Sequence, residues 1–185
     1  MPNANTIAAF QNLSQGNVTS ESAFASAAGG SVRAVLAPPA PVFTAVFEGH
    51  ALRVRAVAKV TGGTTANYTL KVYGNYGGNT NLTTFTSDIN IMTSGAVAVN
   101  SATRLFGLDG LVYWDATSQR LIGEYSGVTD AVGGSAAVIA RAVLANPGTS
   151  LTSASSAFAF LATGLFSASN ASNAAVLTTF ELDLV

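Results

Sequence analysis

The chain has 185 residues, of which 49% are hydrophobic and only 9% are charged, with one histidine and no cysteine. An ordinary soluble domain carries ~25% charged residues, because charged side chains supply much of the surface that faces water. A net charge of −1 argues against broad nucleic-acid binding, which needs a basic surface. Without cysteine there are no disulfides and no thiolate chemistry. Such a chain must bury much of its surface, in a membrane or against other protein copies.

The apolar residues do not form a run long enough for a membrane helix. A bilayer-spanning helix needs ~20 consecutive apolar residues. The longest candidates are residues 136–145, interrupted by Arg141, and residues 157–166, interrupted by Thr163 and Gly164. The first residues also lack the basic and apolar stretches of a signal peptide. We therefore expect synthesis in the cytoplasm, no membrane partner, and assembly with other protein copies.

Residues 1–40 are typical of an extended arm, because Asn, Gln, Ser, Ala and Gly dominate them. A segment of this composition cannot build a core of its own, so it is disordered or lies on a neighbour. Phe10, Phe24 and Val35 are spaced along it as apolar anchors for such a contact. A short helix over residues 20–28 fits the Ser-Glu pair at its start.

From about residue 41 the pattern becomes that of β-strands. In residues 51–60, apolar side chains alternate with Arg53, Arg55, Val57 and Lys59, which is the period of a half-buried strand. A Thr-Gly-Gly-Thr turn follows at residues 61–64, and residues 68–73 alternate again. The two strands and this turn predict a β-hairpin.

The rest of the chain contains further short strands separated by Gly, Asn and Ser turns. Residues 137–145 are Ala-rich, which suits a helix, but their β-branched residues and strand-like neighbours favour a strand. The other predicted strands are residues 42–48, 82–85, 96–99, 103–106, 111–116, 121–125, 157–161 and 175–184. We predict an all-β fold, a jelly-roll-like antiparallel β-sandwich over residues 41–185 with the N-terminal arm at residues 1–40.

The sequence offers little for catalysis or for a cofactor. His50 is the one histidine, and no Gly-x-Ser-x-Gly motif accompanies it. Calcium needs several converging oxygen ligands. Asp109, Asp115 and Asp130 are predicted loop carboxylates, but no Asp-x-Asp-x-Asp-Gly loop is present. We predict no catalytic residues, no cofactor and no metal, with a structural ion as the lesser alternative.

Charged residues cluster in two places along the predicted strands. Glu181 and Asp183 lie on the same face of the last predicted strand. This face is either solvated or in contact with another subunit, or its carboxylates pair with basic residues on a neighbouring strand. The basic residues of the predicted hairpin share one face and suit an acidic surface of a partner better than nucleic acid: Arg53, Arg55, Lys59 and Lys71.

Aromatic residues give a second type of candidate surface. Tyr73, Tyr76 and Trp114 are the side chains that a sugar-binding face would use. A lone tryptophan near an apolar strand is more often part of the core. Glycan binding is therefore an alternative to protein binding.

Two stretches resemble a known family. The run Ala51–Gly74, ALRVRAVAKVTGGTTANYTLKVYG, resembles a hairpin of tailed-bacteriophage virion proteins. The run Val176–Leu184, VLTTFELDL, is similar to the last strand of the same proteins. The resemblance implies a jelly-roll sandwich, often a homotrimer, that decorates or cements a capsid. It implies the major capsid protein as partner and carries no catalytic residues.

We therefore expect a non-enzymatic virion structural protein, a capsid decoration or cement protein on the outer surface of a phage head. Phe10, Phe24, Val35 and the four basic residues would contact the partner. The alternative is a tail-associated or host-glycan-binding β-sandwich module. An enzyme, such as a hydrolase, is a third class for which no set of residues is found.

Overall fold

The computed structural model describes residues 6–10, 13–15, 19–20, 22–24, 35–36, 51–63, 66–75, 88–115, 120–130, 136–143 and 159–185. Its strands are β1 (Thr6–Phe10), β2 (Leu13–Gln15), β3 (Ser22–Ala23), β4 (Val35–Leu36), β5 (Leu52–Thr61), β6 (Asn67–Asn75), β7 (Asp88–Thr93), β8 (Val97–Ala98), β9 (Thr103–Asp115), β10 (Arg120–Asp130), β11 (Ala136–Val143), β12 (Ala159–Phe166) and β13 (Ala174–Leu184). No helix in this part of the chain has the length and apolarity to cross a membrane.

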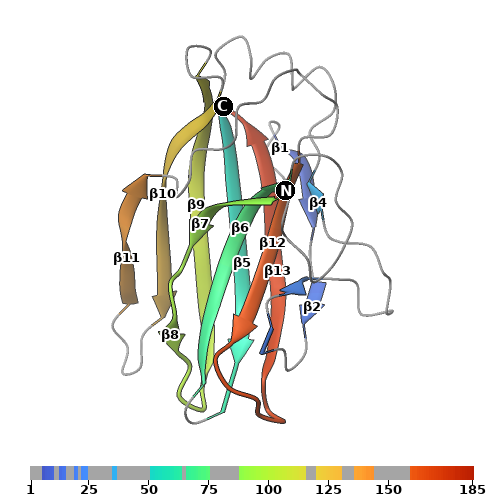
Figure 1. The fold of residues 1–185 in the computed structure, drawn as a ribbon, viewed down its shortest axis with the longest axis vertical. Helices are drawn as coiled ribbons and strands as arrows, with labels where there is room; N and C mark the ends of the chain where they lie inside the picture. The colour runs from blue at the N-terminus through green and yellow to red at the C-terminus, as the bar shows by residue number, and fades with distance from the viewer. Residues whose placement is uncertain are drawn as a thin grey trace.

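The strands form two antiparallel sheets, with β6, β7 and β12 in front of β5, β9 and β13 in Figure 1. Among the described residues, sheet A has seven strands in the order β1-β13-β5-β9-β10-β11, with β2 also paired to β13. Sheet B has six, in the order β3-β12-β6-β7, with β4 paired to β12 and β8 to β6. This confirms the predicted all-β, jelly-roll-like antiparallel β-sandwich.

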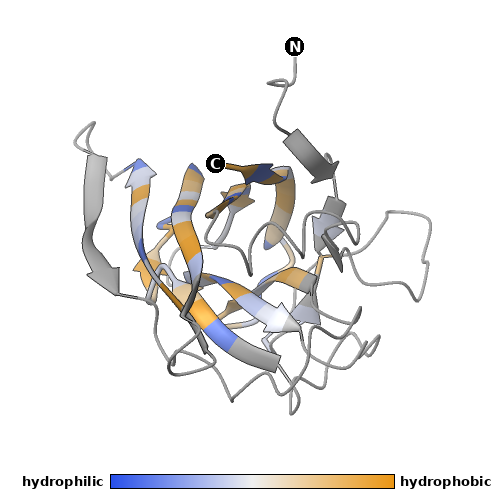
Figure 2. Ribbon diagram, turned by 90° about the horizontal axis from the view of Figure 1, so that it is seen from above, coloured by the Kyte–Doolittle hydropathy of each residue, from blue (hydrophilic) through white to orange (hydrophobic). Residues whose placement is uncertain are grey.

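The core lies between the two sheets and follows the strand period. Hydrophilic and hydrophobic bands alternate along the strands in Figure 2, because successive side chains point to opposite faces. Tyr68 is fully buried at the centre. Its ring lies 5.3 Å from that of Phe106 in sheet A, at 75°, and 4.7 Å from that of Phe166 in sheet B. These aromatic contacts join the two layers.

The predicted hairpin of β5 and β6 is wrong. β5 pairs with β13 and β9 in sheet A, whereas β6 pairs with β12, β7 and β8 in sheet B. The apolar faces of both strands point into the core from opposite sides, because a sandwich buries more of them than one sheet would. The turn therefore crosses between the sheets, and Gly62 and Gly63 within it are buried.

Residues 103–106 and 111–116 were predicted as two strands, but residues 103–106 and 111–115 belong to the single strand β9, and Ala116 lies outside the described residues. Gly107 and Gly110 interrupt the apolar pattern, but neither has a positive φ, and both continue the ladder with β5 and β10. A Cβ at Gly110 would lie 2.6 Å from Met92 Sδ, so a glycine here lets the core side chain approach the backbone. β7 was not predicted from the sequence, and residues 42–48 and 82–85 lie outside the described part.

Other strand predictions are confirmed. Residues 136–143 form a strand, β11, at the edge of sheet A beside β10. β9 and β10 are neighbours, with Asp115 opposite Arg120, as the turn predicted between them requires. The last strand, β13, lies inside sheet A between β5 and the N-terminal strands.

The described parts of residues 1–40 lie on the sandwich. β1 and β2 pair with β13, and β3 and β4 pair with β12. Ser22 and Ala23 are strand residues, so the short helix predicted over residues 20–28 is wrong there. The backbone N–H of Phe24 donates to the carbonyl of Ala162 at 3.3 Å, which satisfies groups along β12 that a helix would leave unpaired.

Candidate functional site

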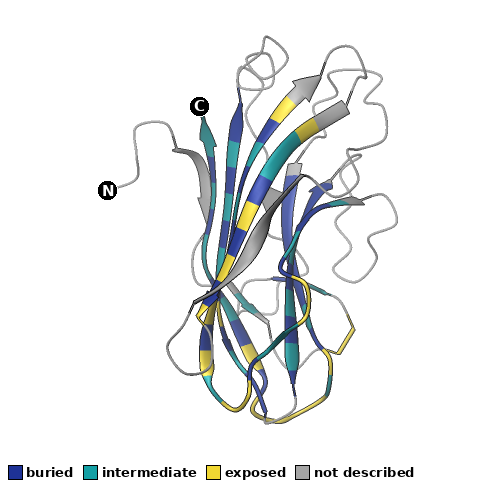
Figure 3. Cartoon of the chain, turned by 90° about the vertical axis from the view of Figure 1, so that its left-hand side faces the viewer, coloured by how far each residue is buried: buried dark blue, intermediate teal, exposed yellow. Residues whose placement is uncertain are grey.

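The face of sheet A that points away from the core carries most of the charged side chains of the described residues. We call it the outer face. Along β9 and β10, buried residues alternate with exposed or half-buried ones, as the banding in Figure 3 shows. Its charged residues, together with Ser126, lie on four neighbouring strands: Arg53, Arg55, Lys59, Asp109, Glu124, Ser126, Asp130, Glu181 and Asp183.

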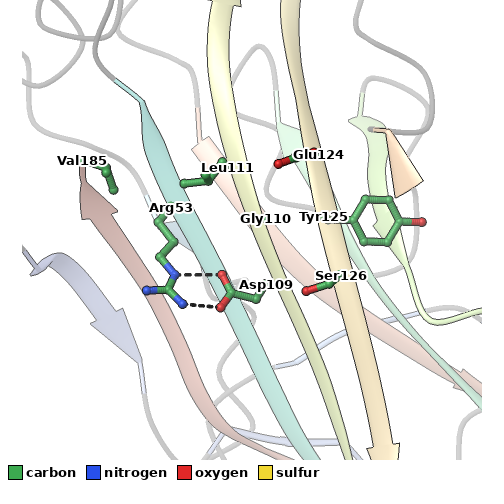
Figure 4. Close-up of a pocket in the computed structure, with 8 residues that line it drawn as sticks. All are labelled: Arg53, Asp109, Gly110, Leu111, Glu124, Tyr125, Ser126 and Val185. Carbon is green, nitrogen blue, oxygen red and sulfur yellow. Dashed lines mark hydrogen bonds and ion pairs between the residues drawn. The ribbon is translucent and has the colours of Figure 1, made fainter. Parts of the chain in front are cut away.

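Arg53 and Asp109 form a bidentate pair on this face (Figure 4). Arg53 Nε donates to Asp109 Oδ1 at 2.9 Å, and Arg53 Nη2 donates to Asp109 Oδ2 at 2.5 Å. The hydrogen bond and charge of Asp109 raise the pKa of the Arg53 guanidinium, with smaller contributions from Asp183 and Glu181. The pair is therefore a bidentate unit that presents donors and acceptors side by side.

Arg55 extends this pair into a row across three strands. Its Nε lies 3.7 Å from Asp109 Oδ2, and its Nη1 donates to Glu181 Oε2 at 3.4 Å. Glu181, Arg55 and Asp109 lie directly opposite one another on β13, β5 and β9, so the sheet register brings them together. This confirms that one of the two carboxylates of the last strand pairs with a basic residue on the neighbouring strand.

Two shallow depressions adjoin this row. The first, of about 540 Å³, is lined by Arg53, Asp109, Gly110, Leu111, Glu124, Tyr125, Ser126 and Val185. The second, of about 300 Å³, is lined by Arg55, Val57, Gly107, Leu108, Asp109, Ser126, Gly127 and Val128. Both contain Asp109 and Ser126, so we treat them as one groove that follows β9 and β10. Gly107 carries no side chain to fill it.

Exposed apolar side chains lie toward both ends of the groove, and one of them, Val128, lines its second depression. Tyr113 and Ile122 lie directly opposite each other on β9 and β10, and 39% and 43% of their surface is exposed. Leu105 and Val128 lie toward the other end of the same two strands and are also exposed. The outer face therefore offers polar groups at its centre and apolar surface at both ends.

The four basic residues predicted as one cluster do not share a face. Arg53, Arg55 and Lys59 lie on the outer face of sheet A, whereas Lys71 lies on β6 in sheet B. The separation follows from the crossing of the chain between the sheets after β5. Lys71 Nζ there lies 3.4 Å from the Tyr73 hydroxyl. A single basic patch of all four residues is therefore wrong.

The three predicted apolar anchors of the arm have different outcomes. Phe24 has no exposed surface and packs within the core of its own chain, so a contact with a neighbouring copy through this ring is not available in this fold. Phe10 lies on β1 and Val35 on β4, but their side chains are outside the described part.

The aromatic residues predicted for sugar binding are not exposed where the structure describes them. Tyr73 keeps 8% of its surface, Tyr76 lies outside the described residues, and so does the side chain of Trp114. Among the described residues, the exposed aromatic ring is that of Tyr113, which was not predicted from the sequence. Strand alternation from Leu111 was the signal that could have identified it as an outward-facing residue.

The structure offers no metal site in its described part. No group of three or more His, Cys, Asp or Glu residues there could hold a metal ion. Asp109, Asp115 and Asp130 are strand residues rather than the loop carboxylates that the sequence suggested. His50 lies outside the described residues.

No family model matches the chain, and no curated protein matches it. Among solved structures, it is similar to the CBM2 module of the Lactobacillus casei BL23 phage J-1 evolved Dit, with 7% identity and a TM-score of 0.31. That match covers 72% of this chain and 62%, less than two thirds, of the other. It is also similar to the metal-free lectin I-B4 from Griffonia simplicifolia, with 7% identity, a TM-score of 0.34, and 96% and 99% of the chains covered. The chain is an all-β sandwich, and these distant matches say nothing about its ligand.

Proposed function

We propose that this chain is a non-enzymatic carbohydrate-binding module that holds a sugar chain in the groove of sheet A. The observation that carries the proposal is the fixed Arg53–Asp109 pair inside an open groove that leads toward the exposed ring of Tyr113. The groove has the volume of a small-molecule site, which typically measures about 300–1,000 Å³. It is open and follows the strands, which suits an extended ligand.

The polar lining supplies both kinds of hydrogen-bonding group that sugar hydroxyls need. Arginine only donates and ionised carboxylates only accept, whereas a serine hydroxyl does both. Arg53, Asp109, Glu124 and Ser126 bring these groups to one face (Figure 4). A hydroxyl can donate to a carboxylate and accept from a guanidinium at the same time, so the mixed lining matches its chemistry.

The apolar ring of Tyr113, next to the groove on β9, supplies the other half of a sugar site. Tyr113 is two residues beyond Leu111 on the same face of β9, and Leu111 lines the groove. A tyrosine ring offers a flat apolar surface, which can pack against the C–H face of a pyranose. From Gly107 to Tyr113 the strand extends roughly 20 Å at ~3.4 Å per residue, which gives room for several sugar units.

We further propose that the module belongs to a phage particle and binds a glycan of the host surface. The resemblance of residues 51–74 and 176–184 to virion proteins supports this setting. The absence of enzymatic activity is part of the proposal and rests on the lack of a catalytic motif in the sequence. An oligomer is also part of it, because 9% charged residues cover little surface.

Affinity electrophoresis through gels that contain soluble polysaccharides tests the proposal. Ser126→Trp places an indole in the groove and should abolish retardation of the full chain by the polysaccharide that the wild type binds. Ser172→Trp is the matched control, because Ser172 is also exposed but precedes β13 at the far end of sheet A. Equal retardation of both variants, with both folded by circular dichroism, would reject the groove as the site.

Capsid decoration is the second candidate, and one observation favours it. Four large hydrophobic side chains are exposed on the outer face of β9 and β10: Leu105, Tyr113, Ile122 and Val128. Apolar side chains grouped on one face of a protein with few charges suit a protein partner such as a capsid shell. Leu105→Ser should then weaken attachment to shells, whereas glycan binding would persist because Leu105 does not line the groove.

A further inference from the structure

Carboxylates outnumber basic side chains on the outer face around the groove. The described outer face holds five carboxylates (Asp109, Glu124, Asp130, Glu181, Asp183) and three basic side chains (Arg53, Arg55, Lys59). Both arginines already contact carboxylates, Arg53 through Asp109 and Arg55 through Asp109 and Glu181. Lys59 does not line the groove. An anionic ligand would therefore meet bordering negative charge.

The same pair keeps unused capacity for neutral hydroxyls. Arg53 has five N–H donors and uses Nε and one Nη2 hydrogen on Asp109, so three donors are not used by this pair. Each carboxylate oxygen of Asp109 has two lone pairs, and Arg53 takes one on each oxygen. The unused N–H donors of Arg53 therefore lie beside the unused lone pairs of Asp109. Two neighbouring hydroxyls on a pyranose ring can bind such an array without any charge of their own.

Asp183 is a second, independent observation that favours an uncharged ligand over an anionic one. Its Oδ1 is buried and has no hydrogen-bond partner, and the residue lies directly opposite Arg53 on β13. A desolvated carboxylate oxygen seeks a donor and disfavours another negative charge nearby. This adds to the negative potential beside the Arg53–Asp109 pair.

We propose that the groove selects uncharged glycans with neighbouring hydroxyls, read by the Arg53–Asp109 pair, and rejects glycans that carry carboxylate or phosphate groups. This inference rests on the proposed carbohydrate-binding function and specifies its ligand. Since no net charge is neutralised on binding, the affinity should change little with ionic strength.

Calorimetric titration of the full chain tests whether the groove selects uncharged glycans. Two neutral polysaccharides, a soluble β-glucan and a galactomannan, are compared with two acidic ones, polygalacturonate and alginate. We expect one or both neutral polymers to bind at least roughly tenfold more tightly than the acidic ones. The affinity should stay constant between about 50 and 500 mM salt. Tighter binding of an acidic polymer overturns the selection and leaves the carbohydrate-binding function standing. Binding of none of the four rejects both.

Two variants with the same change in net charge test the mechanism. Asp109→Asn removes one carboxylate from the groove and frees Arg53, so acidic polymers should gain affinity and neutral ones should lose it. Asp130→Asn is the matched control, because Asp130 is an exposed carboxylate at the end of β10 that does not line the groove. An equal gain for acidic polymers in both variants would trace the effect to overall charge and overturn the role of the pair.

Discussion

Arg53 and Asp109 are not directly opposite each other in the sheet, yet they form two hydrogen bonds. Arg53 lies opposite Leu111, and Asp109 lies opposite Arg55, so the guanidinium reaches diagonally across β5 and β9. The diagonal leaves Arg55 free to contact both Asp109 and Glu181. One carboxylate thus organises two arginines, and it borders both depressions of the groove.

Replacing Arg53 by lysine should separate binding from stability. A lysine keeps the charge but cannot form the bidentate pair, so glycan retention should fall about tenfold. The free energy of unfolding should change by less than about 1 kcal/mol, because both partners are over one third exposed and screened by water. Urea denaturation and affinity electrophoresis measure the two effects. Lys59→Arg, at the far end of β5, is the control and should change neither.

The two glycines of β9 should respond differently to alanine. At Gly110 the new Cβ would lie 2.6 Å from Met92 Sδ and 3.1 Å from Tyr125 Cβ, so overpacking should lower the free energy of unfolding by about 1–3 kcal/mol. At Gly107 the nearest atom is Val128 Cγ2 at 3.3 Å, on an exposed side chain that can move. Gly107→Ala should therefore change stability by less than about 1 kcal/mol. Urea titrations of both variants test this, and equal losses would contradict the opposite orientation of the two positions.

An introduced disulfide should verify that β5 pairs with β9 rather than with β6. Lys59 and Leu105 are exposed and directly opposite each other, and the chain has no cysteine of its own. The double variant Lys59→Cys, Leu105→Cys should oxidise readily, because directly opposite strand residues have Cβ atoms ~5 Å apart. The pair Lys59→Cys, Lys71→Cys should stay reduced, because these residues lie in different sheets. Mass spectrometry after mild oxidation distinguishes the two, and cross-linking of only the second pair would restore the hairpin.

Tyr68 should make the fold sensitive to alkaline pH. Complete burial raises the pKa of its hydroxyl well above the ordinary value of about 10. Because the folded state favours the neutral phenol, this contribution to stability is complete below pH ~10 and declines as the pH rises from there toward the raised pKa.

Urea titrations between pH ~8 and ~11 measure this decline. The variant Tyr68→Phe keeps the aromatic contacts with Phe106 and Phe166 but has no proton to lose. Its free energy of unfolding should therefore fall less steeply than that of the wild type above pH ~10. Parallel pH profiles of the two proteins would show that ionisation of this residue does not limit the fold.

The period of the strands could be read from the sequence because it is a local property. Alternation in residues 51–60 and 179–184 correctly predicted which face of each strand points inward, including Leu182 inside and Glu181 outside. The bulge between Leu177 and Thr179, which shifts this phase, was not predicted. The alternation also predicted part of the candidate site, because it placed Arg53 and Arg55 on the polar face of their strand. Alternation depends only on the pleat of one strand, so no distant residue is needed to see it.

The pairing of the strands was decided by the tertiary structure alone. A strand with one apolar face can join a neighbour in a hairpin or face it across a core, and the local pattern is the same in both. The sandwich placed β5 and β6 in different sheets, which removed Lys71 from the basic cluster and gave Arg53 an acidic partner 56 positions away in the sequence. The sequence by itself determined the alternation and the low charge of this protein. Only the packing of two sheets around one core decided which charges meet and where the groove lies, because those contacts join distant parts of the chain.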